Sequence, residues 1–336
     1  MAAYTTIDDP EAYFQVKAYT GNGTAIGSGG QSLTLDGDTD LSPNMIWFKE
    51  RNSTSNHALF DTVRGATKYL IPDGNYAEAT DTETLTAFNS DGFTVGSASA
   101  ENRDGNLFVA WCWKESADAG FDIVSYAGNA TNRDISHSLS AVPAVMLIKN
   151  LSATLSWRMY HHQNTAAPET DHLILDTTAA TADDDSMWND TAPTSSVFSL
   201  KTSTSVNGSS ANYIAYVFTG KQGFSKFGQY KGNGNADGAF IFCGFRPAFV
   251  MMKRTNTTSE WGVFDNKRDV DNVATLQLKP NASEVEEANG AVDFCANGFK
   301  LRATSVFMNG DDDSYVFMAF AEAPLVNSNG VPGNAR

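Results

Sequence analysis

The sequence lacks the features that mark several large classes of protein. Cysteine is scarce, with 3 among 336 residues, and the absence of a Cys-x-x-Cys pair excludes a disulfide framework and a typical zinc site. No apolar run approaches the roughly 18 residues of a membrane-spanning helix, and the first residues lack the basic and apolar regions of a signal peptide. Basic residues are also few: 23 Lys and Arg stand against 39 Asp and Glu, a net charge of −16, which argues against nucleic acid and membrane surfaces as partners.

Helical periodicity is absent as well. Short runs of β-branched and aromatic residues, bounded by Gly, Asn, Asp, Ser and Thr, fill the chain instead. Such spacing of strands and turn signals is typical of an antiparallel sandwich or barrel. The sequence therefore predicts an all-β protein.

Three features recur in one order at intervals of roughly 105 residues. Each copy begins with a Tyr-x-Gly-Asn turn, continues with a proline-led apolar strand that ends in lysine, and closes on an aromatic-rich strand. The turns are Tyr19–Asn22, Tyr126–Asn129 and Tyr230–Asn233; the proline-led strands are Pro43–Lys49, Pro143–Lys149 and Pro247–Lys253; the closing strands are Leu107–Trp113, Tyr213–Phe218 and Tyr315–Phe320. A period of this size predicts three tandem copies of one small β-domain.

We expect three antiparallel β-sandwiches of six strands each, at residues 1–117 (with an N-terminal arm), 118–222 and 223–322, followed by a C-terminal arm at 323–336. The links between copies are too short to separate them. The proline-led and closing strands show almost no alternation, which is typical of strands covered on both faces. Both observations predict that the copies pack against one another, as a pseudo-trimer within one chain.

No constellation of catalytic residues stands out. The sequence contains no Gly-x-Ser-x-Gly elbow and no His-Glu-x-x-His motif, and no carboxylate pair recurs in all three copies. The acidic runs at 183–185 and 311–313 lack the ligand spacing of a calcium loop, and solvated turns explain them equally well. We expect neither an enzyme, nor a resident metal, nor a cofactor.

One set of residues remains as a candidate ligand-binding rim. Each proline-led strand ends in a lysine, and a tryptophan lies close by; a rim of this kind can grip a sugar or a protein partner. The competing interpretation is that the tryptophans belong to the core and that the lysines extend into solvent. The candidate residues are Trp47, Lys49, Trp157, Lys149, Trp261 and Lys253.

Several strings resemble a module found in tail-fibre and other virion proteins of marine bacteriophages. In the first copy they are Met45–Ser53, His57–Gly65, Ser90–Gly96 and Phe108–Lys114; in the third they are Phe224–Gly234, Phe245–Lys253 and Asn297–Arg302. The order of strands also resembles, more loosely, the six-stranded module of H-type lectins, which assemble as trimers and bind amino sugars. No sugar-binding residue of those lectins can be matched by position.

The resemblance implies a virion protein, assembled in the cytoplasm of a bacterial host and bound to other virion proteins, with a homo-oligomer expected. The leading expectation is a tail-fibre or receptor-recognition component that contacts a host-surface glycan or protein without catalysis. The first alternative is a purely structural part, namely a head decoration, a tail adaptor or a fibre-attachment unit. A glycan-degrading spike is the third, and the missing carboxylate pair argues against it.

Overall fold

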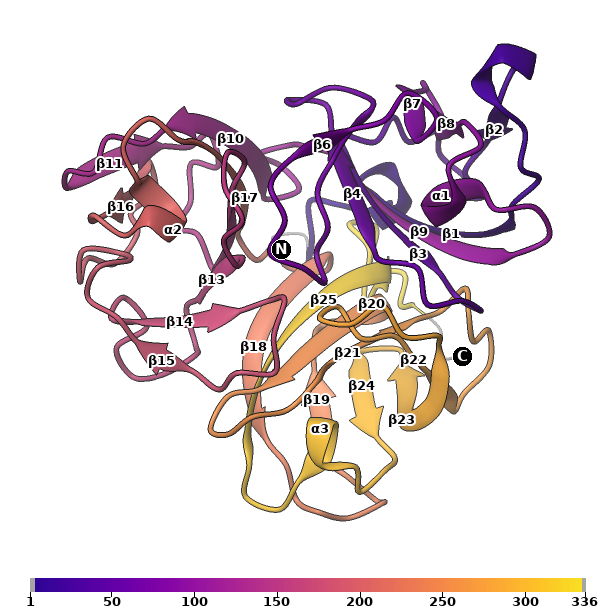
Figure 1. Cartoon of the computed structure of the whole chain (residues 1–336). Coiled ribbons are helices and arrows are strands. Elements are labelled where there is room, and N and C mark those ends of the chain that lie inside the picture. The colour runs from indigo at the N-terminus through magenta and orange to yellow at the C-terminus, as the bar shows by residue number, and fades with distance from the viewer. Residues whose placement is uncertain (1–3, 334–336) are drawn as a thin grey trace.

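The computed structural model describes residues 4–333, which fold into several antiparallel β-sheets with only short helices (Figure 1). The strands fall into three segments, residues 14–113, 121–218 and 225–324. The first contains β1 (Phe14–Thr20), β2 (Gln31–Leu33), β3 (Met45–Glu50), β4 (Ala58–Asp61), β5 (Lys68–Tyr69), β6 (Ala79–Thr80), β7 (Leu85–Phe88), β8 (Phe93–Val95), α1 (Ser99–Asn102) and β9 (Leu107–Trp113). The second contains β10 (Phe121–Ala127), β11 (Arg133–Ser136), β12 (Val145–Asn150), β13 (Arg158–His161), β14 (Asp171–Ile174), β15 (Ala182–Asp183), β16 (Val197–Leu200), α2 (Thr204–Asn207) and β17 (Asn212–Phe218). The third contains β18 (Ser225–Lys231), β19 (Phe240–Phe242), β20 (Phe245–Arg254), β21 (Trp261–Asp265), β22 (Ala274–Gln277), β23 (Glu287–Cys295), β24 (Gly298–Leu301), α3 (Val306–Asn309) and β25 (Ser314–Pro324).

The strand order of the main sheet is the same in each segment. The orders are β1-β9-β3-β4, then β10-β17-β12-β13 with β14 and β15 added, then β18-β25-β20-β21. A second sheet lies over one face of each: β2-β8-β7, β11-β16 and β19-β24-β23-β22. Each segment thus has more strands than the six expected. β2 and β11 were missed because these short strands lie in polar surroundings between the Gly-Asn turn and the proline. β19, which is only three residues long, lies at the corresponding place in the third segment and was missed as well.

The main sheets are buried on both faces. In β3, Ile46 and Phe48 pack toward the second sheet of their own segment, whereas Met45 and Trp47 face a different cluster that takes in residues of all three segments. The closing strand β9 divides its side chains in the same way. This division explains why these strands show no hydrophobic alternation.

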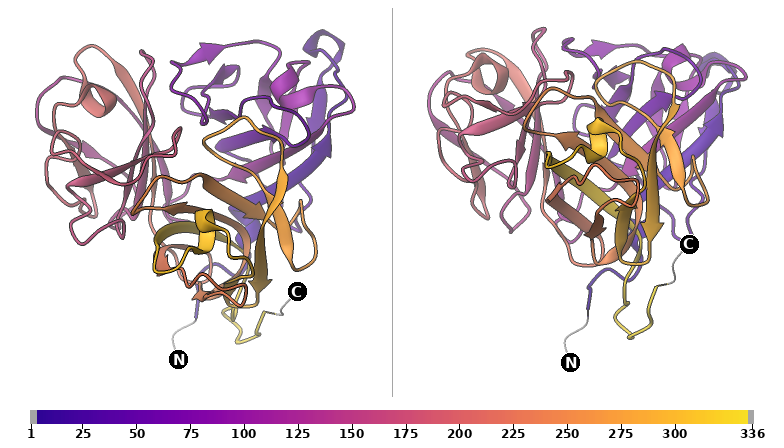
Figure 2. Two further views of the ribbon diagram at one scale, coloured as in Figure 1. Left: turned by 60° about the horizontal axis from the view of Figure 1, so that its bottom comes forward. Right: turned by 90° about the horizontal axis from the view of Figure 1, so that it is seen from below.

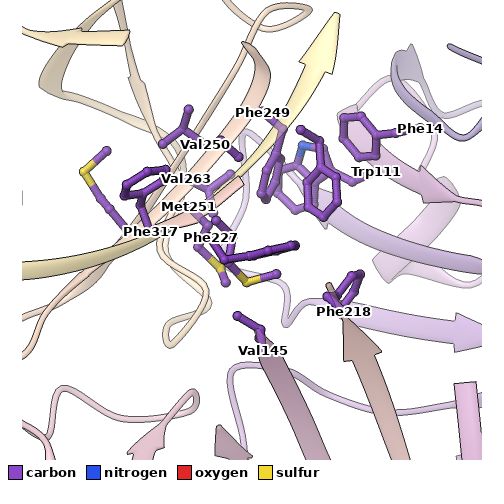
Figure 3. Packing of buried hydrophobic residues seen from close by; sticks show 14 of the residues in the cluster. Phe14, Trp111, Val145, Phe218, Phe227, Phe249, Val250, Met251, Val263 and Phe317 are labelled. Atoms are coloured by element: carbon purple, nitrogen blue, oxygen red, sulfur yellow. The ribbon is translucent and has the colours of Figure 1, made fainter. Parts of the chain in front are cut away.

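Aromatic residues from all three segments meet in the shared cluster (Figure 3). Phe320 of β25 lies 5.1 Å from the ring of Phe14 and 5.9 Å from that of Phe218, centre to centre. Phe249 of β20 packs edge to face against Trp111 of β9 at 5.7 Å. Each large aromatic ring removed from water here contributes a few kcal/mol, so the contacts between segments resemble a domain core.

The Tyr-x-Gly-Asn turn docks on the short helix that precedes the closing strand. In the second segment the Tyr126 hydroxyl donates to the carbonyl oxygen of Val206 (2.7 Å), and the side-chain oxygen of buried Asn207 accepts from the amide of Asn129 (3.1 Å). A Cβ on Gly128 would lie 2.1 Å from the carbonyl oxygen of Gly208. The same contacts recur around Asn102 and Asn309 in the other two segments.

Both ends of the described chain lie beside the third segment (Figure 2). The Tyr4 hydroxyl donates to the carbonyl oxygen of Gly244 (2.9 Å), and the amide of Ser328 donates to the carboxylate of Asp8 (2.6 Å). The first residues of the expected C-terminal arm, up to Pro324, belong to β25. Residues 334–336 of that arm lie outside the described residues.

Candidate functional site

The structure buries all six residues of the candidate ligand-binding rim. None is more than 3% exposed, and each lies where segments meet or beneath a loop. In this structure they do not form a rim that a ligand can reach. The interpretation of the tryptophans as core residues fits this placement, whereas the lysines do not extend into solvent. The six are Trp47, Lys49, Trp157, Lys149, Trp261 and Lys253.

The three lysines share one arrangement, in which the ammonium group folds back onto backbone carbonyls. Lys149 Nζ donates to the carbonyl oxygens of Asn150 (2.7 Å) and Ala153 (3.5 Å). Lys49 does the same in the first segment, and Lys253 also donates to a carbonyl of the second segment. Burial lowers the pKa of each lysine to about 8 because the charged form loses its water.

Replacing Lys149 by Met tests this burial. The pKa of Lys149 is about 8 in the folded chain against 10.5 for an ordinary lysine, so between these values the unfolded chain holds a proton that the folded chain has released. The stability of the natural protein should therefore rise relative to Lys149→Met, by about 2 kcal/mol from pH 8 to 9.5. Urea unfolding of both proteins across this range measures the difference, in which the other titrating groups cancel. A difference that stays flat with pH would contradict the buried, desolvated lysine.

Trp157 and Trp261 connect adjacent segments through their indole N–H groups. Trp157 Nε1 donates to the carbonyl oxygen of Ile71 in the first segment (3.0 Å), and Trp261 Nε1 donates to that of Ile174 in the second (3.2 Å). Trp47 is not their counterpart, because it lies on β3 and donates to a histidine within its own segment.

The first-segment counterpart of these two tryptophans is His57, which precedes β4 as Trp157 precedes β13. Its Nε2 lies 3.1 Å from the carbonyl oxygen of Lys279 in the third segment. Trp47 Nε1 donates to the other ring nitrogen, Nδ1 (2.9 Å), so Nε2 carries the proton and donates. His57 thus connects the first segment to the third, Trp157 connects the second to the first, and Trp261 connects the third to the second. The three contacts form a closed cycle.

We call the three surfaces along which two segments meet the seams. Buried charged groups form hydrogen bonds across two of them. Asp61 accepts from Arg64 Nε within its segment (2.5 Å) and from the Tyr216 hydroxyl of the second segment (2.6 Å). In the corresponding place Asp265 accepts from Arg268 Nε (2.6 Å) and from the indole N–H of Trp111 in the first segment (3.0 Å).

At the seam between the second and third segments, a histidine takes the place of the buried aspartate. His161 stands where the other segments have aspartate, and its Nε2 lies 3.2 Å from the carbonyl oxygen of Phe317 in the third segment. Burial lowers the pKa of His161 to about 3, so the ring is neutral at pH 7. Ionisable groups at all three seams therefore hold the segments together.

The surface of two seams is hollowed into polar grooves. Where the amide of Glu78 donates to the carbonyl oxygen of Leu151 (3.0 Å), a groove of about 530 Å³ opens, with Ser125, Ser152 and Asn212 in its lining. A second groove, of about 540 Å³, opens where the amide of Thr181 donates to the carbonyl oxygen of Thr255 (2.9 Å); Asn164, Gln229 and Asn256 are in its lining.

At the seam between the first and third segments a salt bridge occupies the corresponding place. There the amide of Glu286 donates to the carbonyl oxygen of Arg51 (2.8 Å), and the Arg51 guanidinium binds the Glu286 carboxylate through two N–H groups, at 2.8 and 2.9 Å. Sequence reasoning missed the two grooves because each joins loops of two segments.

Within residues 4–333, no group of three or more His, Cys, Asp or Glu side chains is placed to hold a metal ion. The acidic runs at 183–185 and 311–313 each form an ion pair. Asp185 pairs with Lys201 (2.9 Å), and Asp313 pairs with Arg254 (2.6 Å). Among the described residues, no helix is long and apolar enough to cross a membrane.

A search of the curated proteins finds no match. A family model described as a domain of unknown function, DUF7483, matches residues 9–324 and so spans all three segments. The strands that carry the repeated order, from β1 to the end of β25, lie within the matched range. The chain therefore belongs to the DUF7483 family.

Proposed function

We propose that the three segments are copies of one antiparallel sandwich, packed as a pseudo-trimer within a single chain. The strand order of the main sheets supports this proposal, and so does the cycle of contacts made by His57, Trp157 and Trp261. The proposed copies keep the boundaries expected from the sequence, 1–117, 118–222 and 223–322.

We further propose that the chain is a non-enzymatic bacteriophage virion protein, most simply a tail-fibre or receptor-recognition component. The observation that carries this proposal is that the polar residues at the seams differ largely in kind from those that line the grooves on the surface. Acids, bases and histidines at the seams bond the segments to one another, and the two grooves on the seams carry hydroxyl and amide groups in their lining, beside the charged side chains of Arg64, Lys68 and Glu78 in the first groove. Hydroxyl and amide groups form hydrogen bonds with a host glycan or a protein loop without catalysing a reaction. The resemblance to phage tail-fibre modules supplies the location, a virion assembled in the host cytoplasm, with other virion proteins and further copies of the chain as neighbours.

Competition for host cells tests this function. The purified chain, added in excess, should reduce adsorption of the phage particles that carry it. A variant with Ser152→Arg and Asn212→Arg, which fills the 530 Å³ groove with two long side chains, should lose the effect while its circular dichroism spectrum stays unchanged. An intact chain that leaves adsorption unchanged, together with antibody labelling that finds the chain covered on the particle, would favour a structural role.

A purely structural virion role is the second candidate, and one surface feature favours it. The edge strand β19 exposes Phe240 (46%) and Phe242 (49%) on the outer sheet of the third segment. Exposed aromatic residues on an unpaired sheet edge are typical of a surface that another protein covers. A head decoration, tail adaptor or fibre-attachment unit would use such an edge.

A further inference from the structure

The first segment carries a buried carboxyl group in a place where the other two segments carry apolar side chains. Glu101 is the third residue of α1, immediately before the buried Asn102, and only 1% of it is exposed. The corresponding residues of α2 and α3 are Val206 and Met308, both fully buried. The fold therefore accepts an apolar residue here, and Glu101 is not needed to build it.

The side chain of Glu101 is left incompletely bonded. Its Oε2 atom has no hydrogen-bond partner among residues 4–333, although Tyr19 donates to its backbone carbonyl oxygen (2.6 Å). Burial, together with the nearby carboxylate of Asp81, raises the pKa of Glu101 to about 8. An isolated buried carboxyl group is costly, so its presence calls for a partner.

Glu101 lines a cleft of about 440 Å³ on the outer side of the first segment. Asp81 lines it as well, together with the hydroxyl residues Thr54, Ser55 and Thr84. The lining, within the described part of the chain, contains neither lysine nor arginine. His57 also lines the cleft, but burial lowers its pKa well below 6.5. Within the described lining, therefore, no side chain offers a positive charge to Glu101.

The corresponding hollow of the third segment shows the difference. It measures about 400 Å³ and is lined by Phe307, which takes the place of Ala100 in the first segment. The first segment thus combines a smaller side chain, which makes room, with a carboxyl group in place of Met308. The hollow of the third segment is polar as well, but it is lined by both Lys279 and Glu260. That of the first segment is lined by two carboxyl groups and by neither lysine nor arginine, which suits a cation.

We propose that this cleft binds a small organic cation with N–H donors, an alkylammonium group, which pairs with Glu101 and Asp81. The apolar parts of the lining, Ala98, Ala100 and Ile71, receive the alkyl chain. Two carboxyl groups are too few to hold a metal ion without further ligands, whereas one ammonium group offers three donors. The proposal is independent of the virion function, because it rests on residues of the first segment alone.

Calorimetric titration of the full chain with 1,4-diaminobutane tests the site, with the uncharged 1,4-butanediol as matched ligand. The diamine should bind at least tenfold more tightly than the diol. Glu101→Met, which copies the third segment, should weaken diamine binding at least tenfold while its thermal unfolding midpoint stays the same or rises. Glu101→Gln provides the same test if the Met variant does not fold.

Two results would overturn the proposal. One is equal binding of diamine and diol, or of diamine by the natural chain and both Glu101 variants. The other is a lower unfolding midpoint of both Glu101 variants without ligand, which would assign the carboxyl group a structural role. Titration with Nα-acetyl-lysine amide separates the sources of the ammonium group: tighter binding than the diamine indicates a lysine side chain of a protein, and weaker binding indicates a free amine.

Discussion

Asp61→Ala should lower the free energy of unfolding by about 3 kcal/mol, because the substitution removes the closest counter-ion of a buried guanidinium and leaves only Glu78, at 3.4 Å. Asp61 is fully buried, and Arg64 and Tyr216 both donate to its Oδ2 atom. Since Tyr216 belongs to the second segment, the loss should also loosen the seam between the first two segments. Urea unfolding followed by tryptophan fluorescence measures the effect.

Asp118→Ala is the matched control. Asp118 is an exposed aspartate in the turn between the first two segments, and its replacement should change stability by less than about 0.5 kcal/mol. A loss below about 1 kcal/mol for Asp61→Ala would mean that water reaches Arg64, in contradiction to the closed seam described above.

Gly128→Ala should destabilise the chain by about 3 kcal/mol, at the upper end of the cost of overpacking. The added Cβ would lie 2.1 Å from the carbonyl oxygen of Gly208 and 2.7 Å from the ring of Tyr213. Neither can move easily, because the amide of Gly208 donates to the Tyr213 hydroxyl (2.6 Å) and that hydroxyl donates to the carbonyl oxygen of Thr204 (2.7 Å).

Gly27→Ala provides the comparison for this glycine. A Cβ at Gly27 meets nothing within 4 Å, so Ala there should be neutral or stabilise by up to about 1 kcal/mol through the unfolded state. Equal effects of the two substitutions on the thermal unfolding midpoint would show that close approach is not the reason for glycine at position 128.

The repeated features of the sequence were enough to predict an all-β chain with antiparallel sheets, because strands covered on both faces leave a local signature. The lack of alternation in 43–49 and 107–113 predicted that both faces are buried, and Trp47 and Phe48 do face different clusters. The pairing of His57 with Trp157 and Trp261 could not be predicted in this way. A histidine and a tryptophan look unrelated in sequence, yet each presents an N–H group to a carbonyl of the next segment.

The environments of the three buried lysines and of Glu101 could not be predicted from the sequence either. A lysine at a strand end normally extends into water. The ammonium group of Lys149 is buried instead because the loop that follows it folds over so that its backbone carbonyl oxygens accept hydrogen bonds from Nζ. The burial of Glu101 could not be predicted for a different reason: it lies in a largely polar stretch of sequence, which normally indicates an exposed loop. Aligning the copies on Asn102, Asn207 and Asn309 gives the signal that was available, one acid against two apolar residues.

The hydrogen bond between Asp8 and Ser328 has a consequence for the order of the segments. With Asp8 and Ser328 side by side, a peptide that joins the two ends of the described chain would close it into a ring, and new ends could be opened in the tight turn around Asp118 or at Gln222. The cycle of seams would be the same in every such circular permutant, so the packing itself assigns no segment the first position.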